Sequence, residues 1–224
     1  MSWEFASLSQ DTLVRWIEDS LAAGTHRLAG GYQGQTLLYA DADIRLVIKA
    51  PTGRGLAKWI STLMLRHEAR VYQQLAGFEA APRCHGLLRG RYLVLQYVDG
   101  VSMRHAEITD RGTFFAELLE HLQALHACGV AHSDLQKKDN LLVVDGRHPC
   151  LLDFGAAVIL KPGFAPFNHF HYRFAERLDF NVWAKLKYRG RFEQMSDADR
   201  VYYHRTWLEK FARFLKRLMG KQRK

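Results

Sequence analysis

Two short segments decide the fold of this 224-residue chain: HSDLQKKDNLL at residues 132–142 and LLDFG at residues 151–155. The first is a polar loop that runs into an apolar stretch, and the pattern predicts strands over 141–144 and 149–152. A tripeptide such as Asp153-Phe154-Gly155 arises often by chance. Its position after a His132-x-Asp134 loop, with strand-like segments on both sides, makes coincidence a poor explanation.

The two segments resemble the protein-kinase superfamily, whose catalytic loop reads H-x-D-L-x-x-x-N and whose metal-binding motif reads D-F-G. The resemblance implies that Asp134 is the catalytic base and that His132 braces the loop. It also implies that Asn140 and Asp153 bind Mg2+ at the phosphates of ATP. Phosphoryl transfer needs fixed phosphates, metal ions over the developing charge and a carboxylate that orients the attacking hydroxyl, and the segments supply suitable residue types.

The spacing within the first segment departs from the family pattern. The usual loop places Asn five residues after the Asp, whereas Asn140 is six residues after Asp134 and Asp139 occupies the usual position. The thirteen residues from Asn140 to Asp153 match the family, so we interpret the departure as a one-residue insertion within 136–139. Asn140 is then the metal ligand, and Asp139 stays open as an alternative because a carboxylate binds metal equally well.

The front half of the chain carries a lysine and a glutamate at the spacing that such a site needs. Lys49 ends the predicted strand 44–50 in a Val-Ile-Lys sequence that resembles the V-A-I-K lysine of the family. Glu68 follows nineteen residues later, inside a predicted helix. An ion pair between them would hold the flexible ammonium so that it can reach the α- and β-phosphates.

Two further front-half segments are candidates for nucleotide binding. The sequence GGYQG at residues 30–34 includes Gly31 and Gly34 and lies where the family places a hairpin over the phosphates, although it lacks a full G-x-G-x-x-G. An ordinary tight turn is the alternative. The segment LVLQYVDG at residues 93–100 looks like the family hinge, in which the backbone groups of Gln96 and Val98 would bond the adenine edge.

The order of predicted elements indicates an α+β, compact bilobal protein-kinase-like fold. A β-rich N-terminal lobe is expected over residues 1–98, and a reduced helical C-terminal lobe, with the catalytic loop and a basic tail, over 99–224. Further strands are predicted at 36–40, 84–88 and 92–98, and a glycine-rich turn is predicted at Gly30, Gly31 and Gly34. Helices are predicted at 9–23, at 56–75 and from about 113 to 129, and two or three more at roughly 170–188 and 196–219.

Composition narrows the cellular setting. No apolar run is long enough to span a bilayer, and the first residues lack the pattern of a signal peptide, so a cytoplasmic location is expected. Cys84, Cys128 and Cys150 are scattered, which argues against a disulfide framework and a zinc site. The net charge of +9 predicts affinity for anions, and residues 201–224 carry eight Lys or Arg against one acid.

Three features indicate the kind of kinase. Ser133 replaces the arginine that normally pairs with an activation-loop phosphate, no A-P-E follows Gly155, and few residues remain after it. The chain looks like the bacterial lipopolysaccharide core kinase family, which phosphorylates Kdo or heptose sugars of a glycolipid at the inner membrane. Compact atypical serine/threonine kinases of the RIO or Bud32 type are the alternative. A pseudokinase scaffold is disfavoured because all five polar residues of the motif are present.

The basic C-terminal segment allows two interpretations. Aromatic and leucine residues repeat there at helical spacing between lysines and arginines, which fits a helix packed on the lobe with a solvated basic face. The same pattern fits a helix that docks on an anionic membrane surface, which would make the protein peripheral to the inner membrane. No nucleic-acid partner is expected because no reading motif accompanies the charge.

Overall fold

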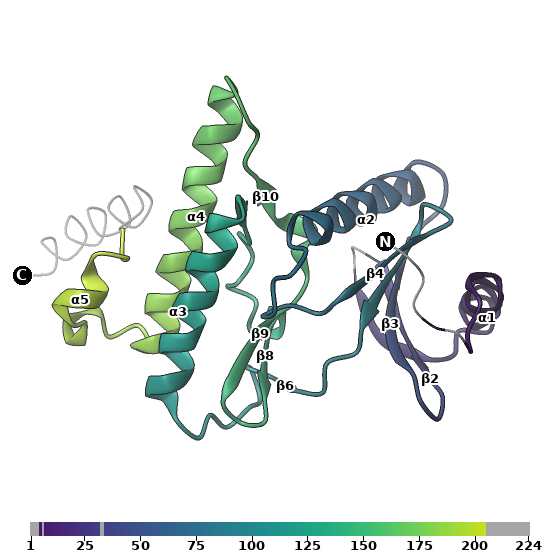
Figure 1. The fold of residues 1–224 in the computed structure, drawn as a ribbon, viewed down its shortest axis with the longest axis horizontal. Helices are drawn as coiled ribbons and strands as arrows, with labels where there is room; N and C mark the ends of the chain where they lie inside the picture. The colour runs from purple at the N-terminus through teal and green to yellow at the C-terminus, as the bar shows by residue number, and fades with distance from the viewer. Residues whose placement is uncertain (1–4, 6, 32–33, 205–224) are drawn as a thin grey trace, which may run out of the picture.

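The computed structural model describes residues 5, 7–31 and 34–204, and its front half is built on a five-stranded antiparallel sheet (Figure 1). The order of strands is β1-β2-β3-β5-β4. Their bounds are Arg27–Gly31 for β1, Gly34–Ala40 for β2, Arg45–Ala50 for β3, Cys84–Leu88 for β4 and Tyr92–Gln96 for β5. β3 lies at the centre of the sheet, and its Lys49 is paired with Thr36 on one side and Leu93 on the other.

Two helices cover opposite faces of this sheet. Side chains alternate along β3, so each face presents apolar side chains against which a helix can pack. Leu46 and Ile48 are fully buried in a cluster with Ile17 from α1 (Gln10–Ala23). Val47 packs on the other face, against the core that includes residues of α2 (Leu56–Gln74). Lys49 shares the face of Val47, so the alternation alone directs its ammonium group away from α1 and toward the rest of the molecule.

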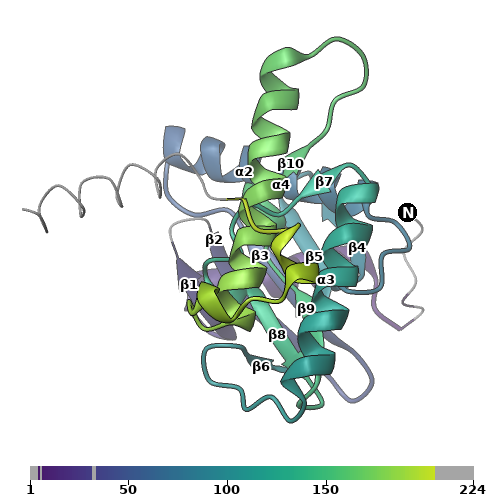
Figure 2. The ribbon, with the colours of Figure 1, turned by 90° about the vertical axis from the view of Figure 1, so that its left-hand side faces the viewer.

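The back half is formed by two long helices, α3 (Arg111–Ala127) and α4 (Pro166–Lys187), which lie side by side (Figure 2). Their contact buries the Phe114 and Phe115 rings and the indole of Trp183, whose Nε1 donates to the Phe115 carbonyl at 2.7 Å. Short strands lie between these helices and the front sheet: β6 (Val101–Ser102), β7 (Val130–Ala131), β8 (Leu141–Val144), β9 (His148–Leu151) and β10 (Val158–Ile159). β8 pairs with both β6 and β9, and β7 pairs with β10.

The α+β, bilobal protein-kinase-like architecture predicted from the sequence is confirmed, as are most of its helices and strands. The three short strands β6, β7 and β10 were not predicted, because two-residue pairings leave no periodic pattern. The predicted glycine-rich turn included too many residues, since Gly30 and Gly31 belong to β1 and Gly34 belongs to β2. The division into lobes at residue 98 stays a prediction.

The helical segment expected over 196–219 is wrong in its first part. Among the described residues of this range, 196–204, only α5 (Asp197–Arg200) is helical, and the chain then leaves the helix through Val201. The side chain of Asn181 on α4 binds both the N–H and the carbonyl of His204, at 2.9 and 2.7 Å, which holds this segment in a non-helical path. The remainder of the predicted basic helix, 205–219, lies outside the described residues. Among the described helices, none is both long and apolar enough to cross a membrane.

Candidate active site

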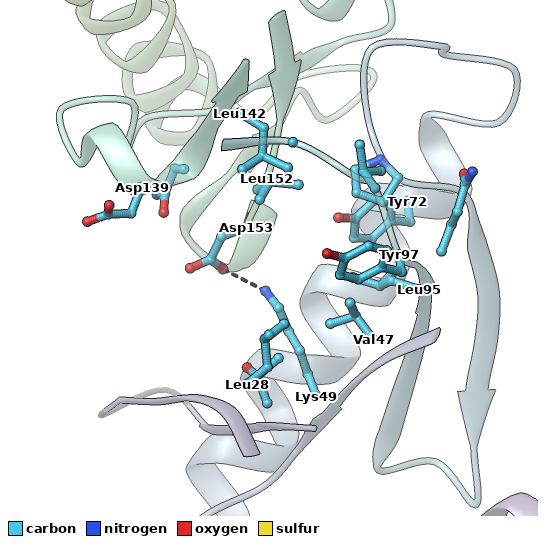
Figure 3. Close-up of a pocket in the computed structure, with 16 residues that line it drawn as sticks. Leu28, Val47, Lys49, Tyr72, Leu95, Tyr97, Asp139, Leu142, Leu152 and Asp153 are labelled. Carbon is cyan, nitrogen blue, oxygen red and sulfur yellow. Dashed lines mark hydrogen bonds and ion pairs between the residues drawn. The ribbon is translucent and has the colours of Figure 1, made fainter. Parts of the chain in front are cut away.

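A cavity of about 350 Å³ lies between the front sheet and the β8–β9 hairpin (Figure 3). Leu28 of β1 and Val47 of β3 form one wall, and Leu142 of β8 and Leu152 form the opposite wall. Two apolar walls on either side of a narrow space suit a flat aromatic ring. One end of the cavity is charged, because Lys49 and Asp153 meet there.

Lys49 is held between two carboxylates that come from distant parts of the chain. Its Nζ lies 2.6 Å from Oε1 of Glu68 on α2 and 2.9 Å from Oδ1 of Asp153. The Glu68 side chain is 3% exposed and the Asp153 side chain 30%, so the first contact is buried and the second opens into the cavity. The fold therefore brings together the three charged residues that the sequence analysis placed on separate elements.

These contacts shift the ionisation of all three groups. Burial by itself lowers the pKa of Lys49, but the negative charges of Glu68 and Asp153 outweigh it and raise that pKa above its usual value. Burial raises the pKa of Asp153, yet the Lys49 charge and hydrogen bond bring it below its usual value. Burial raises the pKa of Glu68 despite the opposing charge of Lys49. The ammonium and the Asp153 carboxylate are thus held in their charged forms, which suits a site for anionic phosphates and a cation.

The backbone at Asp153 is fixed by the packing of its neighbour. Asp153 has a φ of 62°, a left-handed conformation that costs energy for a residue other than glycine. Phe154 is fully buried, with its ring 5.2 Å from that of Tyr72 on α2 and 4.9 Å from that of His132. Since the Phe154 ring fills this space, the Asp153 carboxylate is directed toward Lys49 and the cavity.

The catalytic-loop segment surrounds Asp134 with hydrogen bonds. Its Oδ2 lies 2.6 Å from Nζ of Lys137, and the Asn140 amide nitrogen donates to its backbone carbonyl at 3.0 Å. His132 is fully buried, and its Nε2 donates to the Leu152 carbonyl at 2.9 Å. This bond ties the loop to the residue just before Asp153, so the bracing role expected of His132 has a structural basis.

Lys137 was not identified in the sequence analysis as a site residue. It lies within the proposed one-residue insertion, and its hydrogen bond to Asp134 raises its pKa. The only sign of its role in the sequence was a basic residue between Asp134 and Asn140, and most lysines in such loops are solvated. The contact between Lys137 and the Asp134 carboxylate is visible only in the fold.

Asp179 is the second residue that the sequence analysis left without a role. It is 1% exposed on α4, and its two carboxylate oxygens accept the backbone N–H groups of His132 and Ser133 at 2.7 and 2.8 Å. Nε2 of His126 on α3 donates to the same carboxylate at 3.0 Å. A buried carboxylate with three donors is well compensated, so it fixes the start of the catalytic loop relative to both long helices.

The two alternatives for the metal ligand lie in different environments. The Asp139 carboxylate accepts hydrogen bonds from Nε and Nη2 of Arg104 and, at 2.7 Å, from the hydroxyl of Ser102. These bonds lower its pKa to about 2, and Figure 3 shows it pointing away from the other side chains that line the cavity. Asn140 is 6% exposed and uses its amide nitrogen within the loop. In the part of the chain that the structure describes, no partner engages its amide oxygen.

The remaining candidates come from the β1–β2 pair and from the end of β5 and the segment that follows it. Gly31 and Gly34 are paired where β1 and β2 approach each other, while the residues between them lie outside the described part of the chain. Gln96 ends β5 and donates its backbone N–H to the Arg83 carbonyl at 2.8 Å. Gln96 and Val98 line the cavity, and within the described residues the Val98 N–H has no hydrogen-bond partner.

Comparison with known proteins finds protein kinases. The chain is 40% identical over 74 residues to a protein of Bifidobacterium longum named as serine/threonine-protein kinase pknA2, and 38% identical over 74 residues to kinase PkwA of Thermomonospora curvata. It is 32% identical over 131 residues to a protein of Oryza sativa subsp. japonica named as cyclin-dependent kinase F-2. These matches cover 30%, 30% and 52% of this chain.

The chain spans only 10% of the length of the first two relatives and 39% of the third. No protein-family model matches it. None of these relatives is named as a lipopolysaccharide core kinase. Together with the fold and the arrangement of Lys49, Glu68, Asp134, Asn140 and Asp153, the similarity supports the placement of this chain in the protein-kinase-like superfamily.

Proposed function

We propose that this protein transfers the γ-phosphate of ATP to a hydroxyl group. The observation that carries the proposal is the contact of Lys49 with both Glu68 and Asp153 at the polar end of an apolar-walled cavity. The adenine ring would lie between the walls, with its edge at the backbone of Gln96 and Val98. Lys49 would then contact the α- and β-phosphates.

The site fits Mg2+ by the chemistry of its donors. Among the described residues, no three His, Cys, Asp or Glu side chains converge on a metal site. Mg2+ in phosphotransferases commonly uses one or two protein oxygens and completes its shell with phosphates and water. Asp153 offers a carboxylate and Asn140 an amide oxygen, and we propose these two as the ligands in preference to Asp139. When bound, the ion would neutralise the charge that develops on the transferred phosphoryl group.

Asp134 would act on the acceptor. Its carboxylate side chain is 22% exposed, so an incoming hydroxyl can reach it and give up its proton to it. Lys137 holds one of its oxygens, and Asn140 holds its backbone carbonyl, so the carboxylate has a fixed position. The Lys137 ammonium would also attract the terminal phosphate, since it is near enough to Asp153 for their charges to interact.

The acceptor class is a separate part of the proposal. The names of the similar proteins favour a serine or threonine hydroxyl of a protein. A sugar hydroxyl of the lipopolysaccharide inner core is the second candidate. It is favoured by the short connection 154–165 between Asp153 and α4, which leaves little chain near the site for binding an extended peptide.

The experiment is transfer of labelled phosphate from ATP in the presence and absence of Mg2+, with purified lipopolysaccharide core and a panel of proteins offered side by side. Label on protein alone would remove the glycolipid candidate, and label on the core alone would remove the protein candidate. No transfer to either acceptor, together with no nucleotide binding, would refute the proposal as a whole.

Asp134→Asn is the test of mechanism. It should lower turnover by about 10²–10⁴-fold, the usual range for a general base, while nucleotide affinity changes little. Asp145→Asn is the matched control, because Asp145 is an exposed aspartate in the β8–β9 turn whose φ of 49° asparagine tolerates well. Full activity in Asp134→Asn would overturn the assignment of the base.

A further inference from the structure

Three phenylalanines at the beginning of α4 are almost entirely in solvent. Phe164 is 98% exposed, Phe167 91% and Phe170 75%, and we call these three residues the aromatic tip. The loop that carries Phe164 and the first turns of α4 form the uppermost part of the molecule in Figures 1 and 2. Exposed aromatic residues that gather in one place usually mark a binding surface, because single exposed apolar residues are common but clusters are not.

α2 presents a second apolar surface. Leu56, Trp59, Ile60 and Leu63 follow the i, i+3, i+4, i+7 spacing of one helix face, and all four are between 40% and 71% exposed. The opposite face of α2 is the one that packs in the core, through Leu65, Ala69 and Tyr72 among others. We call the exposed residues the α2 apolar face. The helix α2, like the beginning of α4, lies in the upper part of the molecule in both views.

The chain segments that carry the two surfaces contain charges of one sign. No acidic residue occurs between Asp43 and Glu68, or between Asp153 and Glu176. The first interval contains Arg54, Lys58 and Arg66 close to the α2 apolar face, and the second contains Lys161 and Arg173 beside the aromatic tip. All five are exposed. Positive charge of one sign is complementary to an anionic lipid leaflet, which presents a uniform negative surface.

The aromatic tip is joined to the candidate active site by short, hydrogen-bonded connections. Its chain emerges from β10, which pairs with β7, and β7 leads directly into His132. On the other side, Nε2 of His67 in α2 donates to the Ala157 carbonyl at 2.7 Å. Both surfaces are therefore attached to elements that border Asp134 and Asp153.

We propose that the aromatic tip and the α2 apolar face form one docking surface for an anionic lipid bilayer. The aromatic and aliphatic side chains would enter the interfacial region, and the surrounding lysines and arginines would lie at the lipid headgroups. The residues of this surface are others than those of the basic segment 205–224. The inference does not rest on the proposed function, since binding to lipid requires neither nucleotide nor turnover.

The test is sedimentation of the full chain with vesicles of phosphatidylcholine alone and of phosphatidylcholine mixed with phosphatidylglycerol. We expect binding to the mixed vesicles, weaker binding to the neutral ones, and a decrease as salt is raised. The triple variant Phe164→Ser, Phe167→Ser, Phe170→Ser should partition into mixed vesicles at least roughly tenfold less, because burial of even one such ring can account for that factor. Trp59→Ser with Ile60→Ser should also weaken binding.

Matched controls come from exposed residues elsewhere. Val101→Ser removes a side chain that is 53% exposed on β6, and it should leave vesicle binding unchanged. For charge, Lys161→Glu with Arg173→Glu should weaken binding, whereas Arg147→Glu in the exposed β8–β9 turn should have a much smaller effect. Because each substituted side chain is exposed, each variant should keep a thermal midpoint close to that of the parent.

Three results would overturn the proposal. The first is an absence of binding to mixed vesicles. The second is unchanged binding by the triple phenylalanine variant, which would assign any affinity to the basic segment 205–224. The third is self-association that depends on the aromatic tip without vesicle binding, which would make the partner a second copy of the chain. A failure of phosphate transfer would leave this inference standing, and a failure of vesicle binding would leave the proposed function standing.

Discussion

Removal of the Asp179 carboxylate is expected to destabilise the protein far more than removal of an ordinary acidic side chain. In Asp179→Ala the N–H groups of His132 and Ser133, and Nε2 of His126, lose their acceptor inside the molecule. A hydrogen bond to a charged group contributes about 1.5–3 kcal/mol, so the two backbone bonds alone account for about 3–6 kcal/mol. This is a large share of the roughly 5–15 kcal/mol of a typical domain.

Thermal unfolding followed by circular dichroism is the appropriate assay. For a domain of this size each kcal/mol shifts the midpoint by about 2–4 °C, so Asp179→Ala should unfold roughly 6–24 °C below the parent. Asp179→Asn keeps one acceptor oxygen and places an amide donor against the other N–H group, so we expect about half of that loss. Urea unfolding of the same variants gives an independent estimate of the free energy of unfolding.

Glu176→Ala is the control for this prediction. Glu176 lies one turn earlier on α4, is 35% exposed, and approaches Nδ1 of His126 only to 3.8 Å. Its removal should cost less than about 1 kcal/mol. The reasoning is refuted if Asp179→Ala and Glu176→Ala shift the midpoint equally, or if Asp179→Asn is as stable as the parent.

Three further expectations concern the metal ligands, a buried hydroxyl and the thiols. Asn140→Ala should raise the Mg2+ concentration needed for half-maximal phosphate transfer, whereas Asp139→Ala should change that concentration by no more than a few-fold. A larger effect of Asp139→Ala than of Asn140→Ala would make Asp139 the ligand. Tyr72 is 4% exposed, and its hydroxyl has no hydrogen-bond partner among the described residues. Tyr72→Phe removes this unpaired buried polar group, so it should keep or raise the melting temperature. A clear decrease would show that the hydroxyl is hydrogen-bonded. Burial raises the pKa of Cys84 and raises that of Cys150 to about 11, so on the order of one Cys150 thiol in a thousand is ionised at pH 8. Mass spectrometry after iodoacetamide treatment should therefore find both thiols unmodified until the chain is unfolded. Rapid labelling of the native protein would contradict this.

Local sequence patterns predicted most helices and strands of the fold, because the formation of a helix or strand depends largely on residues that are near in sequence. The helix α1 illustrates this: Ser9 caps its first turn by accepting the Thr12 N–H, and Gly24 ends it with a φ of 69°. Periodicity alone did not reveal which face of α2 is covered. Ile60 and Leu63 have the helical spacing of an apolar face of α2, yet both are exposed, since burial depends on what packs against a face and not on the face itself.

The sequence by itself determined the order of the chemical groups: Lys49, Glu68, Asp134, Asn140 and Asp153 occur at spacings that already indicated phosphoryl transfer. Only the tertiary structure decided which groups meet. Asp179 reaches the catalytic loop across 47 residues of sequence, and Arg104 reaches Asp139 across 35. Such contacts leave no periodic signal, because they are set by how α3, α4 and the short strands pack, and no local pattern encodes that packing. For the same reason the tertiary structure alone separates Asn140, whose amide oxygen is free of partners among the described residues, from Asp139, which Arg104 holds at the surface.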